Sequence, residues 1–136
     1  MLKRTTNKKV KNATPIEVDG IRFRSTLESF VYKLLKENNI PFSYEKETIT
    51  FIPAFEYLGK KIRPWTYTPD FTGDNFVIEV KGWANDAFPN KWKLLKYMYF
   101  QQKKEIELFL VHSKKEAIEA VEKIKELCQI KNKKNS

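Results

Sequence analysis

The sequence predicts an α/β fold with a mixed central β-sheet flanked by helices. Three observations support this prediction: helical periodicity after Ser25, period-two alternation over residues 76–81, and a continuous apolar run at 108–111 that follows a further helical segment. Strands that alternate with helices along a chain are typical of helices layered on a sheet. We therefore expect helices near both ends of the chain and mixed strands between them.

The first expected element is a helix that begins after Ser25, a suitable N-cap. Pro41 ends this helix. At about 100° per residue, Glu28 lies at the edge of the apolar stripe, so we expect its carboxylate to face inward. The stripe has the spacing of a core-facing helix and consists of Leu27, Phe30, Val31, Leu34 and Leu35.

The next part of the chain contains two strand patterns and a turn region. Residues 48–51 alternate threonine with apolar residues, and residues 42–44 are a second strand candidate close by. Gly59 and Pro64 are residues that interrupt regular structure, so we expect a turn region between them.

The C-terminal third predicts a helix, a strand and a last helix. Pro89 opens a helix that reaches about residue 102, and the apolar run at 108–111 suits a strand covered on both faces. The last helix begins at Lys114, with Ala117, Ile118, Val121, Ile124 and Cys128 on its apolar side. Three aromatic residues of the preceding helix are expected in the core: Tyr97, Tyr99 and Phe100.

Length and composition indicate one globular domain. The chain has 136 residues, of which 41% are hydrophobic and only one is a cysteine. This excludes an internal disulfide and makes a structural zinc site improbable. The sequence has no apolar run long enough for a membrane span and no secretion signal, so we expect a cytoplasmic protein with no membrane partner.

The net charge of +9 is concentrated at the two ends of the chain. Residues 131–136 carry three lysines and no acid, which predicts a short basic tail, and residues 13–130 form the domain between the two ends. Such arms suit a polyanion, but they equally suit a role in solubility. The N-terminal arm, residues 1–12, carries Lys3, Arg4, Lys8, Lys9 and Lys11.

A predicted hairpin carries the candidate catalytic residues. A short strand at 70–72 and a longer one at 76–81 flank a turn, and alternation places Glu79 and Lys81 on the same face of the longer strand. Asp70 begins the partner strand, near Glu79 or Lys81. Two acids and a lysine form the grouping that metal-dependent phosphodiester cleavage needs, because carboxylate oxygens bind Mg²⁺. The alternative is an exposed cross-strand ion pair.

Three sequence blocks resemble a known nuclease family. They are F-R-S-T-L-E at 23–28, T-Y-T-P-D-F at 66–71 and F-V-I-E-V-K-G at 76–82, in that order. The second and third together match the P-D…(D/E)-x-K signature of the restriction-endonuclease-like nuclease superfamily. All three resemble blocks of the phage endonuclease I family, whose members resolve Holliday junctions.

This resemblance implies a restriction-endonuclease-like core and a catalytic set of Glu28, Asp70, Glu79 and Lys81. It further implies that Asp70, Glu79 and Glu28 bind Mg²⁺ or Mn²⁺. The family forms homodimers that exchange N-terminal segments between subunits. Residues 55–63 make a longer connection here, so the chain is expected to form a homodimer either with or without that exchange.

The leading hypothesis is therefore a metal-dependent DNA endonuclease that resolves Holliday junctions or other branched DNA. A phage or prophage protein of this kind would act in the cytoplasm of the bacterial host cell. The alternatives are a nuclease of the same fold that acts on linear, nicked or transposon-end DNA, and a DNA-binding module without activity. Besides the N-terminal arm, the candidate DNA contacts are Arg24, Lys60, Lys61, Arg63, Lys91 and Lys93, which could also be ordinary surface charges.

Overall fold

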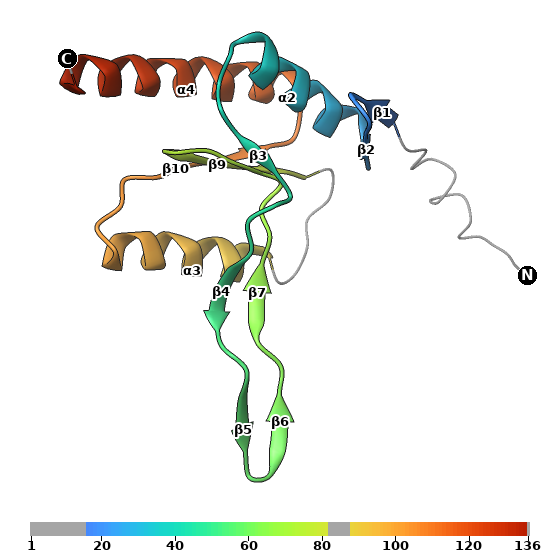
Figure 1. Cartoon of the computed structure of the whole chain (residues 1–136), viewed down its shortest axis with the longest axis vertical. Coiled ribbons are helices and arrows are strands. Elements are labelled where there is room, and N and C mark those ends of the chain that lie inside the picture. The colour runs from blue at the N-terminus through green and yellow to red at the C-terminus, as the bar shows by residue number, and fades with distance from the viewer. Residues whose placement is uncertain (1–15, 82–87, 136) are drawn as a thin grey trace, which may run out of the picture. The chain divides into compact units, whose positions relative to one another are not determined.

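The computed structural model describes residues 16–81 and 88–135, and it confirms a mixed α/β protein (Figure 1). The described residues divide into two compact units. Unit 1 consists of residues 16–40 and 112–134, and unit 2 of residues 41–111 outside the gap at 82–87. Each unit is described separately below.

Unit 1 begins with a short antiparallel hairpin that the sequence did not predict. Strand β1 (Ile16–Val18) pairs with β2 (Ile21–Phe23) across the two-residue turn Asp19-Gly20. Both turn residues have positive φ angles, 53° and 78°. Aspartate followed by glycine is favoured in this type of turn because both residues tolerate the left-handed region.

Helix α2 (Thr26–Glu37) confirms the first predicted helix and its cap. Ser25 adopts an extended conformation, and its hydroxyl accepts a hydrogen bond from the backbone N–H of Glu28 at 3.1 Å. Val31 and Leu35 are fully buried, and Glu28 is buried with them, as its position at the edge of the stripe predicts.

Helix α4 (Lys114–Asn135) starts where the sequence predicts but differs in two respects. Ala117, Val121 and Ile124 are buried as predicted, but Ile118 is exposed and Ala120 is buried instead. The backbone is helical as far as Asn135, so residues 131–135 continue this helix. Lysine has a good intrinsic helix propensity, which explains why a basic segment can extend a helix.

Unit 2 contains a four-stranded mixed sheet with the order β10-β9-β8-β3. Strands β3 (Ser43–Tyr44), β8 (Phe71–Thr72) and β9 (Phe76–Val80) pair antiparallel, which confirms the predicted hairpin. Strand β10 (Glu107–Val111) pairs parallel with β9. Because β10 lies at the edge of the sheet, Leu110 is 36% exposed, and the prediction of a strand covered on both faces is wrong there.

Two further strand pairs extend from this sheet within unit 2 (Figure 1). Strand β4 (Ile49–Ile52) confirms the predicted strand and pairs with β7 (Trp65–Tyr67). The expected turn region is a second hairpin, in which β5 (Phe55–Tyr57) pairs with β6 (Lys60–Ile62). Each of its strands has only three residues, too few for a recognisable alternation.

Helix α3 (Phe88–Gln101) confirms the second predicted helix and packs on β9. Leu95 is fully buried in a cluster with Tyr67, Val77 and Phe88. Because alternate residues of a strand share a face, α3 covers the side of β9 that carries Val77 and Glu79.

Two predicted core residues of α3 are exposed instead, since the exposed fraction of Tyr97 is 57% and that of Phe100 is 74%. Tyr99 is half-buried and packs against the cluster around Leu95. Within the described ranges, no helix is long and apolar enough to cross a membrane.

Candidate active site

The β8–β9 hairpin brings Asp70 next to Glu79. Phe71 pairs with Ile78, and continuing this antiparallel register by one residue places Asp70 opposite Glu79. The Asp70 Oδ2 atom accepts a hydrogen bond from the backbone N–H of Val80 at 2.8 Å. Asp70 is 4% exposed and Glu79 is 6% exposed, so two carboxyl groups are buried at adjoining strand ends.

Glu79 has polar contacts on both of its carboxylate oxygens. Its Oε1 atom accepts a hydrogen bond from the Tyr67 hydroxyl at 2.5 Å, and its Oε2 atom lies 3.5 Å from Lys81 Nζ. Burial raises the pKa of Glu79, while the Tyr67 hydrogen bond, the charge of Lys81 and the backbone of Asp70 act to lower it. The predicted placement of Glu79 and Lys81 on one face is confirmed by their ion pair.

Lys81 lies at the more accessible side of this group. Its side chain is 24% exposed, and its ammonium group lies 4.8 Å from the centre of the Phe88 ring, within the range of a cation–π contact. The Phe88 ring in turn packs edge-on against Tyr67, with centroids 6.3 Å apart. We call Tyr67, Asp70, Glu79, Lys81 and Phe88 the β9 site.

Tyr67 and Phe88 are the members of the β9 site that the sequence did not predict. Burial and the neighbouring Glu79 raise the pKa of Tyr67 far above its ordinary value, so the hydroxyl keeps its proton and acts as a donor. Tyr67 stands three residues before Asp70 in the sequence. A buried acid on a strand needs a hydrogen-bond donor, and this requirement could have identified Tyr67. Phe88 has no such signal.

Glu28 belongs to unit 1, whereas the β9 site belongs to unit 2. Glu28 is 5% exposed and stands in the first turn of α2. Its Oε2 atom lies 3.4 Å from a guanidinium nitrogen of Arg24, whose side chain is largely exposed. The participation of Glu28 in the site of Asp70 and Glu79 remains a prediction.

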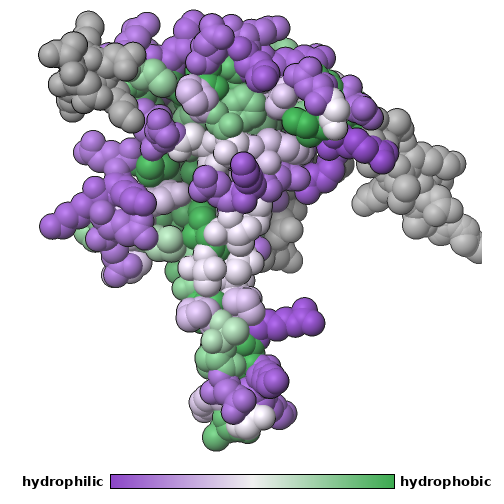
Figure 2. All heavy atoms as spheres, in the orientation of Figure 1, coloured by the Kyte–Doolittle hydropathy of each residue, from purple (hydrophilic) through white to green (hydrophobic). Residues whose placement is uncertain are grey.

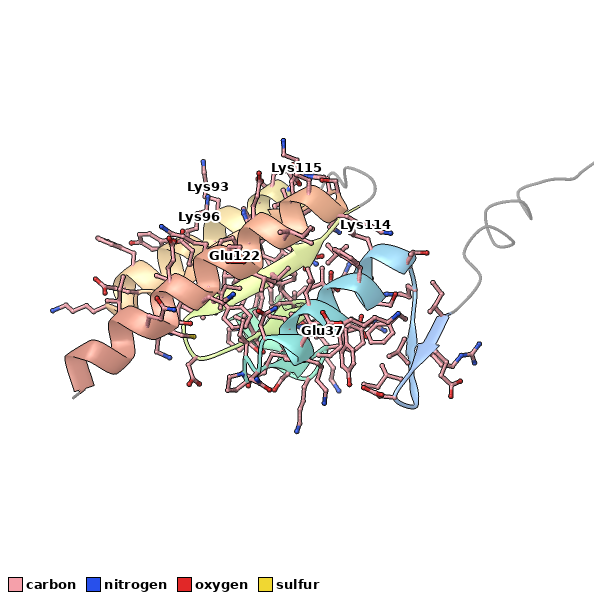
Figure 3. All side chains as sticks on the ribbon, turned by 90° about the horizontal axis from the view of Figure 1, so that it is seen from above. Glu37, Lys93, Lys96, Lys114, Lys115 and Glu122 are labelled. Atoms are coloured by element: carbon pink, nitrogen blue, oxygen red, sulfur yellow. The ribbon has the colours of Figure 1, made fainter. Side chains whose placement is uncertain are left out.

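The predicted DNA contacts fall on three parts of the described chain. Arg24 precedes α2 in unit 1, and Lys60, Lys61 and Arg63 are exposed on or beside β6. Lys93 is exposed on α3, where Figure 3 shows it close to Lys96, and Lys91 is half-exposed on the same helix. The basic residues predicted in the N-terminal arm, Lys3, Arg4, Lys8, Lys9 and Lys11, lie outside the described residues.

The donor atoms of the β9 site fit a hard divalent cation with few protein ligands. Mg²⁺ is commonly held by one or two carboxylates, with waters and substrate phosphate oxygens completing its shell. Asp70 and Glu79 supply two such carboxylates. In the ranges that the structure describes, no group of three or more His, Cys, Asp or Glu side chains is placed to hold a metal. The β9 site therefore offers two carboxylate ligands.

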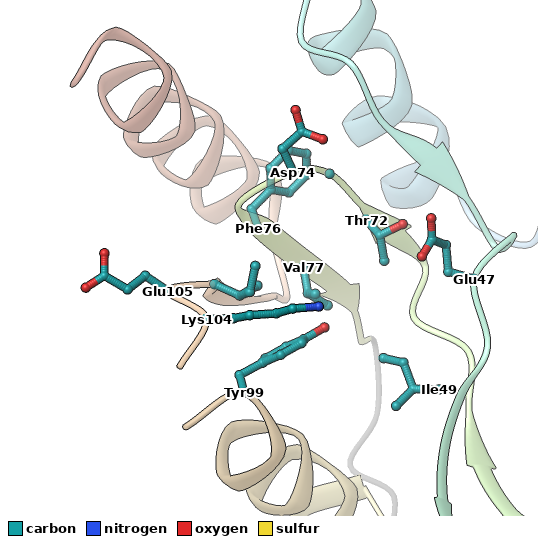
Figure 4. Close-up of a pocket in the computed structure, with 11 residues that line it drawn as sticks. Glu47, Ile49, Thr72, Asp74, Phe76, Val77, Tyr99, Lys104 and Glu105 are labelled. Atoms are coloured by element: carbon teal, nitrogen blue, oxygen red, sulfur yellow. The ribbon is translucent and has the colours of Figure 1, made fainter. Parts of the chain in front are cut away.

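A separate pocket of about 380 Å³ lies at the other end of β9 (Figure 4). Phe76 and Val77 form part of its wall, and Tyr99 and Lys104 reach into it from the end of α3 and the segment that follows. Burial and the charge of Glu47 raise the pKa of Tyr99. None of the residues of the β9 site lines this pocket.

The chain belongs to a family described as "Protein of unknown function (DUF1064)", whose sequence model matches residues 8–116. The matched range includes Glu28 and the whole β9 site. No curated protein and no solved structure gave a significant match to the chain.

Proposed function

We propose that this protein is a Mg²⁺- or Mn²⁺-dependent DNA endonuclease with a restriction-endonuclease-like core, acting on four-way junctions or other branched DNA. The observation that carries the proposal is the hydrogen bond from the Val80 N–H to Asp70, because it joins the Asp70 carboxylate to the segment between Glu79 and Lys81. Two buried acids and a lysine on adjoining strands match the requirements of phosphodiester hydrolysis.

The residues of the β9 site have different roles in this proposal. Asp70 and Glu79 hold the cation, and a bound cation would polarise the scissile phosphate. Lys81 stabilises the negative charge that develops on the phosphate, which its partial exposure allows it to reach. Tyr67 orients the Glu79 carboxylate, and Phe88 supports the Lys81 ammonium group.

Two features support DNA as the substrate. The net charge of +9 favours a polyanion, and the sequence blocks resemble those of junction-resolving enzymes. Because many nucleases share one fold, the choice of branched over linear DNA rests on that resemblance alone.

The test is a cleavage assay on junction, flap, nicked, linear and single-stranded DNA in Mg²⁺ and in Mn²⁺. We expect junction DNA to be cut, and we expect Asp70→Asn to abolish cleavage while DNA affinity stays within about threefold, because the lost charge binds the cation rather than phosphate. Glu105→Gln, which removes an exposed acid, is the matched control.

An Asp70→Asn protein that still cuts junctions would refute the site. Preferential cutting of linear, nicked or transposon-end DNA would support the first alternative. Binding without any cleavage by the wild-type protein would support a DNA-binding module.

A further inference from the structure

The tip of the β5–β6 hairpin has an unusual residue at its turn. Leu58 and Gly59 form a two-residue turn with positive φ angles of 50° and 79°. Leucine is a poor residue for the left-handed region, because its Cβ atom crowds the backbone there. The Leu58 side chain is nevertheless 85% exposed, so its burial does not compensate for the unfavourable conformation.

The β1–β2 hairpin of the same chain provides a direct comparison. Its turn has nearly the same φ angles, 53° and 78°, but its first residue is Asp19, a type that favours this conformation. The turn geometry therefore does not require leucine. A residue that opposes both local preference and burial is a signal of function rather than of folding.

The hairpin also has one mainly apolar face that is exposed to solvent. Phe55 pairs with Ile62 and Tyr57 pairs with Lys60, so these four side chains share a face, whereas the Glu56–Lys61 pair lies on the other. Phe55, Tyr57 and Ile62 are all exposed. Figure 2 shows hydrophobic and hydrophilic residues side by side on this projecting hairpin.

The charges of the hairpin indicate the chemistry of its partner. Lys60, Lys61 and Arg63 outnumber the single acid Glu56, so the hairpin is basic. Phosphates complement these cations, and a two-stranded β-ribbon fits a groove of DNA. Proteins that bind the minor groove of DNA frequently insert apolar side chains between base steps and bend the duplex.

We infer that the β5–β6 hairpin inserts into a groove of the DNA substrate and that Leu58 enters a base step as a wedge. This inference rests on the proposed function, and it adds the surface that distorts the substrate. A second copy of the chain is a poorer occupant, because the basic hairpins of the two copies would repel each other.

The variant Leu58→Asn tests the wedge without disturbing the turn, since asparagine tolerates positive φ better than leucine does. Wild-type and variant proteins are each mixed, in EDTA, with a DNA junction and with a DNA duplex. Both DNAs carry fluorophores at their ends, which report bending, and 2-aminopurine in one strand, which reports an unstacked base. We expect Leu58→Asn to lower affinity about tenfold, to return end-to-end energy transfer to the free-DNA value, and to abolish the 2-aminopurine signal of an unstacked base.

Two further variants separate the wedge from general surface effects. Phe100→Asn removes an exposed aromatic side chain from α3 and should leave all three readouts unchanged. Replacing both Lys60 and Lys61 with glutamine should make the slope of log affinity against log salt shallower by about 1.8.

Unchanged affinity and bending by Leu58→Asn would overturn the inference. A wild-type dimer that Leu58→Asn converts to monomers in sedimentation experiments, with DNA bending unaffected, would also overturn it and would assign the hairpin to self-association. If the wild-type protein cuts junctions while Leu58→Asn bends them normally, only the wedge fails. If the wild-type protein bends DNA through Leu58 but cuts nothing in Mg²⁺ or Mn²⁺, only the nuclease proposal fails.

Discussion

The pKa of Glu79 is set by two opposing effects. Burial beneath α3 disfavours its charged form, whereas the Tyr67 hydroxyl and the Lys81 ammonium group favour it. Burial is the stronger influence, so the carboxylate is ionised at the expense of some folding stability. Such tension is typical of functional acids, and it makes the protonation of Glu79 sensitive to changes in its neighbours.

Tyr67→Phe should therefore change the pH dependence of cleavage. The Tyr67 hydrogen bond lowers the pKa of Glu79, so its loss raises that pKa further, and a higher pH is then needed to ionise the group. We expect the acid limb of the cleavage profile to move to higher pH, with the rate recovering at alkaline pH. Tyr97→Phe, which alters an exposed tyrosine, is the control. An acid limb that stays in place would contradict the role of Tyr67.

Glu79→Gln should stabilise the metal-free protein at neutral pH while abolishing cleavage. Because the pKa of Glu79 is raised in the folded state, the folded protein binds a proton at Glu79 more tightly than the unfolded chain does. The free energy of unfolding therefore falls as pH rises from the pKa of Glu79 in the unfolded chain to its pKa in the folded protein. Above that interval the wild type buries a charge that glutamine lacks. Urea unfolding in EDTA should give a higher free energy of unfolding for Glu79→Gln at pH 7. That advantage should disappear below the ordinary pKa of glutamate, and a variant less stable than wild type at pH 7 would refute the assignment.

At the level of elements, the turn between β8 and β9 fixes how Asp70 faces Glu79. The Gly73 N–H donates a hydrogen bond to the carbonyl of Phe76 at 3.0 Å, which closes the turn. A Cβ atom on Gly73 would lie 2.1 Å from the ring of Phe76, which is fully buried, so one of the two residues would have to shift. Glycine is therefore required by this close approach.

Gly73→Ala should destabilise the protein by about 1–3 kcal/mol through overpacking against Phe76. Denaturant unfolding measures this loss. Phe76→Leu supplies the control, because a smaller side chain leaves space for the new methyl group. The double variant, Gly73→Ala with Phe76→Leu, should be more stable than the sum of the two single effects predicts. Simple additivity of the two effects would show that the contact with Phe76 is not the reason for glycine at position 73.

Most elements with strong local signals could be predicted from the sequence. The Ser25 cap and the period of α2, and the alternation of β9, depend on neighbouring residues, and the structure confirms them. The β5–β6 hairpin was missed because Leu58-Gly59 lacks the usual asparagine or aspartate. The exposure of Leu110 depends on the place of β10 at the sheet edge, which no local pattern records.

The candidate site was predictable to the same extent. Asp70, Glu79 and Lys81 follow from strand alternation and a short turn, and they lie together as expected. Phe88 could not be predicted, because its contact with Lys81 depends on how α3 packs against the end of β9.

At the level of the whole molecule, the sequence motif spans both units. Glu28 stands on α2 in unit 1, and the β9 site stands in unit 2. If Glu28 belongs to the proposed site and the chain forms the homodimer that the sequence predicts, each site is completed either within one subunit or from both subunits. The resemblance to enzymes that exchange N-terminal segments favours the second arrangement.

Mixing two inactive variants distinguishes these arrangements. Glu28→Gln subunits and Asp70→Asn subunits are allowed to form heterodimers. If each site takes Glu28 from one subunit and Asp70 from the other, one site of the heterodimer carries both substitutions and the other site carries neither. We then expect nicking of one strand to return to about half of the wild-type rate per dimer. In verified heterodimers, a mixture that stays inactive would show that each subunit builds its own site, while the catalytic roles themselves would be unaffected.

The parallel pairing of β9 with β10 has a consequence for the order in which the site assembles. Glu107 pairs with Phe76, which stands 31 residues earlier in the chain, whereas the β8–β9 hairpin closes over only a few residues. Short loops close first because they lose less chain entropy. During synthesis, Asp70 and Glu79 can therefore meet before α3 and β10 have left the ribosome. The backbone support of Lys81, whose N–H donates to the Val111 carbonyl at 3.0 Å, can form only after β10 has been made.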